Sequence, residues 1–99
     1  MKDIKDYIIE STQSEDLQSE ISLALKEFGS VRNGFKVANI DDIIDALYKI
    51  EFDYDEENSD DDKLSFVGNY IDTKYELDLY IEDRVKGKVK IKSFNVFEV

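Results

Sequence analysis

The first half of the chain carries apolar residues at spacings of three and four, which is the period of an α-helix. One such stripe runs through residues 17–28 and follows Ser14, a favourable N-cap residue. A second stripe runs through residues 40–47 and follows Asn39, which can cap a helix in the same way. Together with a shorter pattern over residues 1–10, these stripes predict two to three N-terminal helices.

In the second half, the pattern changes to that of β-strands, most of it an alternation of apolar and polar residues. The segments concerned are residues 48–55, 64–71, 75–82 and 88–99. The alternation slips near Ser93, where a β-bulge is expected, and Asn33-Gly34 predicts a small separate hairpin. The chain is therefore expected to be an α+β protein, with its helices packed on one face of a four-stranded antiparallel meander.

Two of the predicted strands carry charges of opposite sign on their polar faces. The acids are Glu76, Asp78 and Glu82, and the bases are Lys88, Lys90 and Lys92. Cross-strand pairs of opposite charge contribute about 0.2–1 kcal/mol each. This pairing predicts a structural role for the lysines, and no direct binding of nucleic acid.

Composition removes most kinds of catalytic chemistry. The chain has 99 residues, a length typical of a single domain (1–99), and contains no His, no Cys and no Pro. Thiol and histidine catalysis, Cys/His zinc sites and disulfides are thereby excluded. No apolar run approaches the ~18 residues of a membrane span. We expect a cytoplasmic protein that has no enzymatic activity, no cofactor and no membrane contact.

The formal net charge is -11, and most of it lies in the middle third of the chain. Residues 34–63 carry 3 basic and 11 acidic residues, and residues 51–62 alone hold eight carboxylates. This acidity indicates a protein that binds something positive, such as the basic surface of a nuclease or another nucleic-acid-binding protein. The predicted partner-binding residues are Glu51, Asp53, Asp55, Glu56, Glu57, Asp60, Asp61 and Asp62, widened by Asp41, Asp42 and Asp45.

The same acids allow other interpretations. The acids at 41–42 also suit the first turn of the predicted helix, because the helix dipole favours negative charge there. The run from Asp53 starts like a calcium-binding loop, but it has Asn58 where that loop needs Gly and Leu64 where it needs Glu. We therefore expect no metal site. An acidic loop over residues 55–63 that only keeps the protein soluble would have the same composition.

Charge spacing limits what the predicted strand can imitate. Glu51, Asp53 and Asp55 would stand about 6.7 Å apart, which gives three charges over about 13 Å. Duplex DNA carries one charge per ~1.7 Å of its axis, or roughly eight over the same length. The strand alone is therefore a poor mimic of DNA. A credible mimic requires the acids of residues 56–62 to fold back beside the strand.

The N-terminus carries a pattern of a different kind. Residues 1–11 combine Met-Lys, a short polar stretch, an aromatic-aliphatic pair and a Glu followed by a small residue. This segment resembles the capsid-targeting leader of internal head proteins from T-even-type tailed phages. The resemblance implies cleavage by the phage prohead protease between Glu10 and Ser11, with Ile8 two positions before Glu10. An ordinary amphipathic first helix would explain the same residues.

Two expectations from different classes follow. The first is a small acidic binding protein, encoded by a phage or mobile element, that acts in the cytoplasm of a bacterial host cell. It would occupy the basic nucleic-acid-handling surface of a host defence enzyme or of a nuclease toxin. The resemblance is in line with it, because some proteins of that phage group inhibit host restriction enzymes. The alternative is a virion-associated or scaffold protein whose acidity serves solubility only.

Overall fold

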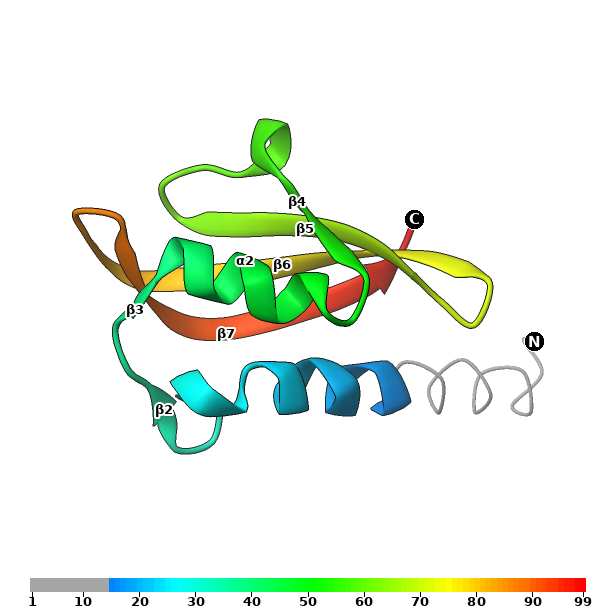
Figure 1. The fold of residues 1–99 in the computed structure, drawn as a ribbon, viewed down its shortest axis with the longest axis horizontal. Helices are drawn as coiled ribbons and strands as arrows, with labels where there is room; N and C mark the ends of the chain where they lie inside the picture. Colours follow the sequence, from blue (N-terminus) through cyan, green and yellow to red (C-terminus); the bar gives the residue numbers. More distant parts are fainter. Residues whose placement is uncertain (1–14) are drawn as a thin grey trace, which may run out of the picture.

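A computed structural model gives the fold of residues 15–99, which form a five-stranded antiparallel sheet with two α-helices on one side (Figure 1). The predicted class, α+β, is confirmed. The predicted first helix, the Ser14 cap and the predicted cleavage site at Ile8, Glu10 and Ser11 lie outside the described residues. No helix in the described part of the chain is long and apolar enough to cross a membrane.

The first described helix covers residues 15–24 and leads into a 3-10 turn, η1 (Lys26–Phe28). Its predicted apolar stripe is buried in the core and consists of Leu17, Ile21, Leu25 and Phe28. The hairpin predicted from Asn33-Gly34 is also present, since β1 (Gly29–Ser30) pairs with β2 (Gly34–Phe35). Each strand has only two residues, since the turn takes in residues 31–33 and Gly34 already belongs to β2.

The second helix, α2 (Ile40–Tyr48), begins where the sequence predicts it. Asn39 lies at the N-cap position in an extended conformation, but its side chain makes no capping hydrogen bond. A backbone contact is made instead, because Ile40 N donates to Gly87 O at 3.1 Å. Ile43 and Leu47 are fully buried, so α2 faces the core with its predicted stripe.

The strand predicted over residues 48–55 begins four residues earlier than the strand in the structure. Tyr48 is the last residue of α2 and is exposed, and the chain then turns through Glu51, which has a φ of 67°. Ile50 N donates to Leu47 O at 3.1 Å, so this segment closes the helix and does not pair with the sheet. The strand itself, β4 (Phe52–Asp55), begins only after the turn.

Four strands form the predicted meander, and a fifth is added at its edge. The meander runs from β4 through β5 (Lys63–Tyr70) and β6 (Thr73–Val85) to β7 (Lys88–Glu98). The fifth strand, β3 (Ala38–Asn39), pairs with β7 and gives the order β3-β7-β6-β5-β4. The prediction of four strands missed β3 because two residues are too few to show an alternation.

Two-residue turns set the register of the meander. Ile71 and Asp72 join β5 to β6, and Lys86 and Gly87 join β6 to β7. All four have positive φ, of 49°, 60°, 44° and 82° in that order, as a type I′ turn requires. The β6–β7 pairing shifts just beyond Tyr80, which faces the position where the sequence predicts a bulge.

This register corrects the predicted pairing of charges. Glu76 and Asp78 lie opposite uncharged residues of β7 and face no lysine there. Among the expected pairs, Glu82 and Lys90 do meet, with 3.0 Å between Oε2 and Nζ. The prediction was wrong for the other two acids because they lie far from the β6–β7 turn, whereas the lysines lie close to it.

One glycine lets the start of β4 lie close to β5. A Cβ atom on Gly68 would lie only 2.5 Å from Glu51 O and 2.9 Å from Phe52 Cγ. The absence of a side chain at this position therefore leaves room for the turn that precedes β4. Phe52 is buried in the core, so the next residue, Asp53, lies on the opposite face of the sheet.

Candidate functional site

The face of the sheet opposite α2, which we call the outer face, carries two aligned rows of side chains. One row consists of Asp53, Val67, Glu76 and Phe97, on β4, β5, β6 and β7 respectively. The other consists of Asp55, Ser65, Asp78 and Asn95. The register thus brings four carboxylates onto one face, and we call Asp53, Asp55, Glu76 and Asp78 the acidic cluster.

The strands give this acidic cluster a regular geometry. β4 and β6 are separated by β5, which places them about 10 Å apart. On each strand the two acids are two residues apart, which is about 7 Å. Between them, β5 contributes the short side chains of Ser65 and Val67. Negative charge therefore lies on both sides of a strip of small residues.

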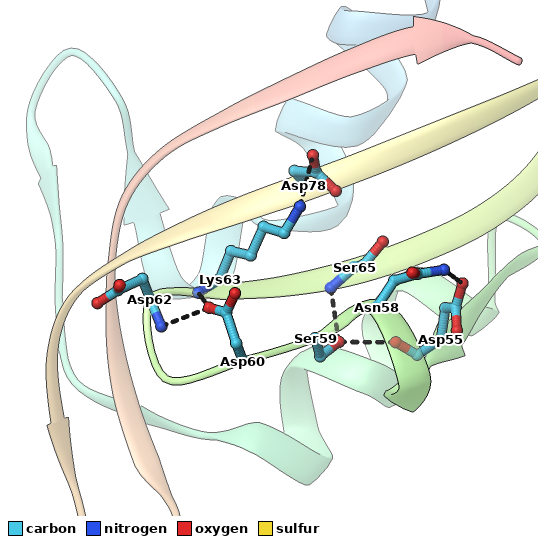
Figure 2. Close-up of polar contacts among 8 residues, drawn as sticks. All are labelled: Asp55, Asn58, Ser59, Asp60, Asp62, Lys63, Ser65 and Asp78. Carbon is cyan, nitrogen blue, oxygen red and sulfur yellow. Dashed lines mark hydrogen bonds and ion pairs between the residues drawn. The ribbon is translucent and has the colours of Figure 1, made fainter.

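Asp78 is the most buried of the four acids. It is 4% exposed, and Ser65 beside it is fully buried. Lys63, at the start of β5, places Nζ 3.6 Å from Asp78 Oδ2 (Figure 2). Asp78 Oδ1 and Ser65 Oγ, however, make no hydrogen bond within residues 15–99. Since an unsatisfied buried polar group costs about 1–3 kcal/mol, the cluster contains two atoms that a ligand could stabilise.

The cluster also changes the proton affinity of Glu76. Burial raises the pKa of Glu76 above its ordinary value, and the neighbouring Asp78 carboxylate raises it further, both through its charge and by accepting a hydrogen bond from the protonated form of Glu76. Asp55 raises this pKa as well, whereas the Lys63 ammonium lowers it. The carboxylates of β4 and β6 therefore act on one another across β5.

The connection between β4 and β5 follows a hydrogen-bonded path along the sheet (Figure 2). It begins with a short 3-10 turn, η2 (Glu56–Asn58). Asn58 Nδ2 donates to Asp55 Oδ2 at 2.6 Å, and Ser59 Oγ donates to Asp55 O at 2.8 Å. Ser59 Oγ in turn accepts from Ser65 N at 2.8 Å, which fixes the connection to β5.

The second half of this connection is tied to β6. Asp60 Oδ1 accepts from the backbone N atoms of Asp62 and Lys63, at 2.8 and 3.0 Å. Ile81 N donates to Asp62 O at 2.8 Å, and Arg84 Nη2 donates to Asp60 O at 3.0 Å. The acidic loop, residues 55–63, is thereby held against the sheet with five exposed acids, Glu56, Glu57, Asp60, Asp61 and Asp62.

Four of the predicted partner-binding residues lie away from the acidic cluster. Asp41, Asp42 and Asp45 are exposed on α2, which packs on the other side of the sheet from the acidic cluster. Glu51 lies in the turn at the far end of β4, beside Ile71. The predicted residues that the structure does bring together are Asp53, Asp55, Glu56, Glu57, Asp60, Asp61 and Asp62.

Two acids of the cluster, Glu76 and Asp78, were not among the predicted partner-binding residues. Their alternation in the sequence already places them on the polar face of a strand. The register was the missing information, because the turn at Ile71–Asp72 contains neither Gly nor Asn and is not recognisable as a tight hairpin. Without that turn, the sequence does not indicate that this polar face continues the one of β4.

The arrangement can bind a cationic group through charge and hydrogen bonding. No three or more acids in the described part of the chain are placed to hold a metal ion. The carboxylates and the buried Ser65 hydroxyl can accept hydrogen bonds from such a cationic group. No protein-family model, no curated protein and no solved structure matches this chain.

Proposed function

We propose that this chain is a small acidic binding protein without enzymatic activity that occupies the basic nucleic-acid-handling surface of another protein. The observation that carries this proposal is the acidic cluster with the acidic loop fixed beside it. The partner is a host defence enzyme or a nuclease toxin, which would make the chain an inhibitor or an immunity protein. The resemblance of residues 1–11 to a phage leader supports an origin in a phage or mobile element and action inside a bacterial cell.

Charge density supports the proposal. The acidic cluster holds four carboxylates within about 7 Å along the strands, and duplex DNA presents about four phosphates over the same length of axis. Lys63 offsets one of these charges at Asp78. The exposed acids of the loop extend the negative surface beyond the end of β4, and they are Glu56, Glu57, Asp60, Asp61 and Asp62. The combined surface is much closer to duplex DNA in charge than β4 alone.

A cleavage assay with a panel of restriction endonucleases and nuclease toxins tests the proposal. The purified protein should inhibit at least one enzyme, and the triple variant D53N/E56Q/E57Q should inhibit it about tenfold less, because three exposed charge pairs together contribute roughly 1–2 kcal/mol. These three acids are exposed and make no ion pair within residues 15–99, so their neutralisation should leave the fold intact.

The matched control is D41N/D42N/D45N, which makes the same change in net charge on α2. It should inhibit as well as the original chain if binding uses the outer face. Equal loss in both triple variants would mean that only net charge matters. Absence of inhibition across the panel would contradict the proposal and would favour the virion or scaffold role instead.

A further inference from the structure

Lys63 does not satisfy all the hydrogen-bonding atoms in the acidic cluster. Lys63 supplies a single ammonium, and its Nζ lies 3.6 Å from Asp78 Oδ2, which is longer than the ~2.8 Å of a charge-assisted hydrogen bond. Asp78 Oδ1 and Ser65 Oγ, both on the same row of the outer face, have no hydrogen-bond partner in the described part of the chain. The Lys63 side chain is 31% exposed, so it can leave this position without disturbing the core.

We propose that the acidic cluster receives one arginine side chain of the basic partner, and that Lys63 holds this position in the free protein. This inference rests on the proposed function and names the group that the partner inserts. A guanidinium is planar and carries five N–H donors, so it can contact both oxygens of Asp78 where an ammonium contacts one. Its methylene stem can lie over the short Val67 side chain of β5.

The spacing of the strands favours the same occupant. A planar cation on the β5 strip has Asp53 and Asp55 on one side and Glu76 on the other, with the two sides about 10 Å apart. A guanidinium that makes a hydrogen bond of about 2.8 Å on each side spans most of this separation. The small ammonium of a lysine covers less of it, and with Lys63 in place two buried atoms, Asp78 Oδ1 and Ser65 Oγ, have no hydrogen-bond partner in the described part of the chain.

An NMR titration with short end-blocked peptides tests this inference. The probes are Gly-Arg-Gly and Gly-Lys-Gly, and the readout is the amide resonances of Ser65 and Asp78 at low salt. The arginine peptide should shift both resonances saturably, with an affinity at least about threefold higher than that of the lysine peptide. Identical shifts and affinities for the two peptides would overturn the inference, since they would report general attraction to negative charge.

Two substitutions of Lys63 give opposite expectations. Lys63→Arg keeps the net charge but places a guanidinium in the site within the same chain, so it should raise the melting temperature and abolish the response to the arginine peptide. Lys63→Met removes the internal competitor and should tighten peptide binding about three- to tenfold. Lys74→Met is the matched control, because it removes an equal charge from an exposed position of β6 outside the cluster.

The Lys63→Arg variant tests the proposed arginine site even if Lys63→Met folds poorly. A peptide response in Lys63→Arg equal to that of the original chain would overturn the inference, as would equal gains in Lys63→Met and Lys74→Met. The peptide assay is independent of the nuclease panel. A response that depends on Lys63 together with no inhibited nuclease would keep the arginine site and overturn the proposed function. Inhibition without such a response would overturn the arginine site alone.

Discussion

Individual residues determine both where the acidic cluster lies and how much charge it carries. Gly68 permits the close approach of the turn before β4, and β4 carries two of the four carboxylates. On β6, burial and the Asp78 carboxylate together raise the pKa of Glu76, which weakens the negative charge of the cluster as the pH falls. A single substitution at Gly68 and another at Glu76 can test these two effects separately.

Replacing Gly68 by alanine should destabilise the fold by about 1–3 kcal/mol, because the added methyl overlaps Glu51 O and the Phe52 ring. The expected result is a lower denaturation midpoint in urea with an unchanged slope. Asn69→Ala, at the next and exposed position of β5, should change stability much less. Equal midpoints for Gly68→Ala and the original chain would mean that β4 does not depend on this close approach.

Glu76→Gln should stabilise the protein at neutral pH. A raised pKa means that the folded state holds the proton more tightly than the unfolded state does. The stability that Glu76 contributes is therefore present below its ordinary pKa of 4.5 and is lost as the pH rises through the higher value of the folded state. Glutamine stays neutral, so the gain should be largest at pH 7 and should shrink toward pH 4.5.

Urea titrations of the two proteins across this pH range measure the difference. The exposed acid Glu57 provides the control, since Glu57→Gln should change stability by a small amount at every pH. A difference between Glu76→Gln and the original chain that does not vary with pH would contradict the coupling of Glu76 to its neighbours.

At the scale of the elements, the two-residue turns decide which charges meet. The turn at Lys86–Gly87 places the lysines of β7 opposite the end of β6, and the turn at Ile71–Asp72 places Asp78 opposite Ser65. Ile71 has a φ of 49°, which is unfavourable for a β-branched residue, and its side chain is 65% exposed. The turn that builds the acidic cluster is thus strained.

Ile71→Asn should therefore stabilise the protein by about 1 kcal/mol, because asparagine tolerates a positive φ better than isoleucine does. Thermal melts should show this gain as an increase of several degrees. Ile71→Val retains the branched Cβ and should give no increase. A higher melting temperature for both variants would assign the gain to the loss of exposed apolar surface and not to the backbone.

The elements differ in how well the sequence predicts them, for identifiable reasons. Long periodic segments, such as residues 17–28 and the later strands, carry many repeats of their pattern and were predicted correctly. The end of α2 was misplaced because Tyr48 and Ile50 continue the alternation of β4 by chance, and the turn at Glu51 contains no glycine. For the candidate site, the acids of β4 and its loop were identified, whereas those of β6 required a register that only the folded chain reveals.

At the scale of the whole molecule, the net charge of -11 acts on the fold and on binding in different ways. Repulsion between like charges destabilises the compact state, and salt screens that repulsion. Attraction between the acidic cluster, with its loop, and a basic partner is screened by the same ions. Salt should therefore favour folding while it opposes complex formation.

Raising the salt concentration from about 50 to about 500 mM should accordingly increase the melting temperature and weaken inhibition of the proposed partner nuclease by at least tenfold. Melting curves and inhibition curves recorded at the same salt concentrations test both effects together. A protein whose acidity serves solubility only would show the first effect without the second. Inhibition that is independent of salt would contradict an electrostatic mode of binding.

The hydrogen bonds that hold the acidic loop against β5 and β6 have a consequence for the speed of association. Ser59 and Asp60 fix the loop in the free protein, so the loop itself does not have to become ordered when the proposed partner binds. Stopped-flow traces should then be single exponentials whose rates rise linearly with partner concentration. Ser59→Ala removes a central contact of the loop, and complexes of that variant should form more slowly while the charge of the molecule stays the same.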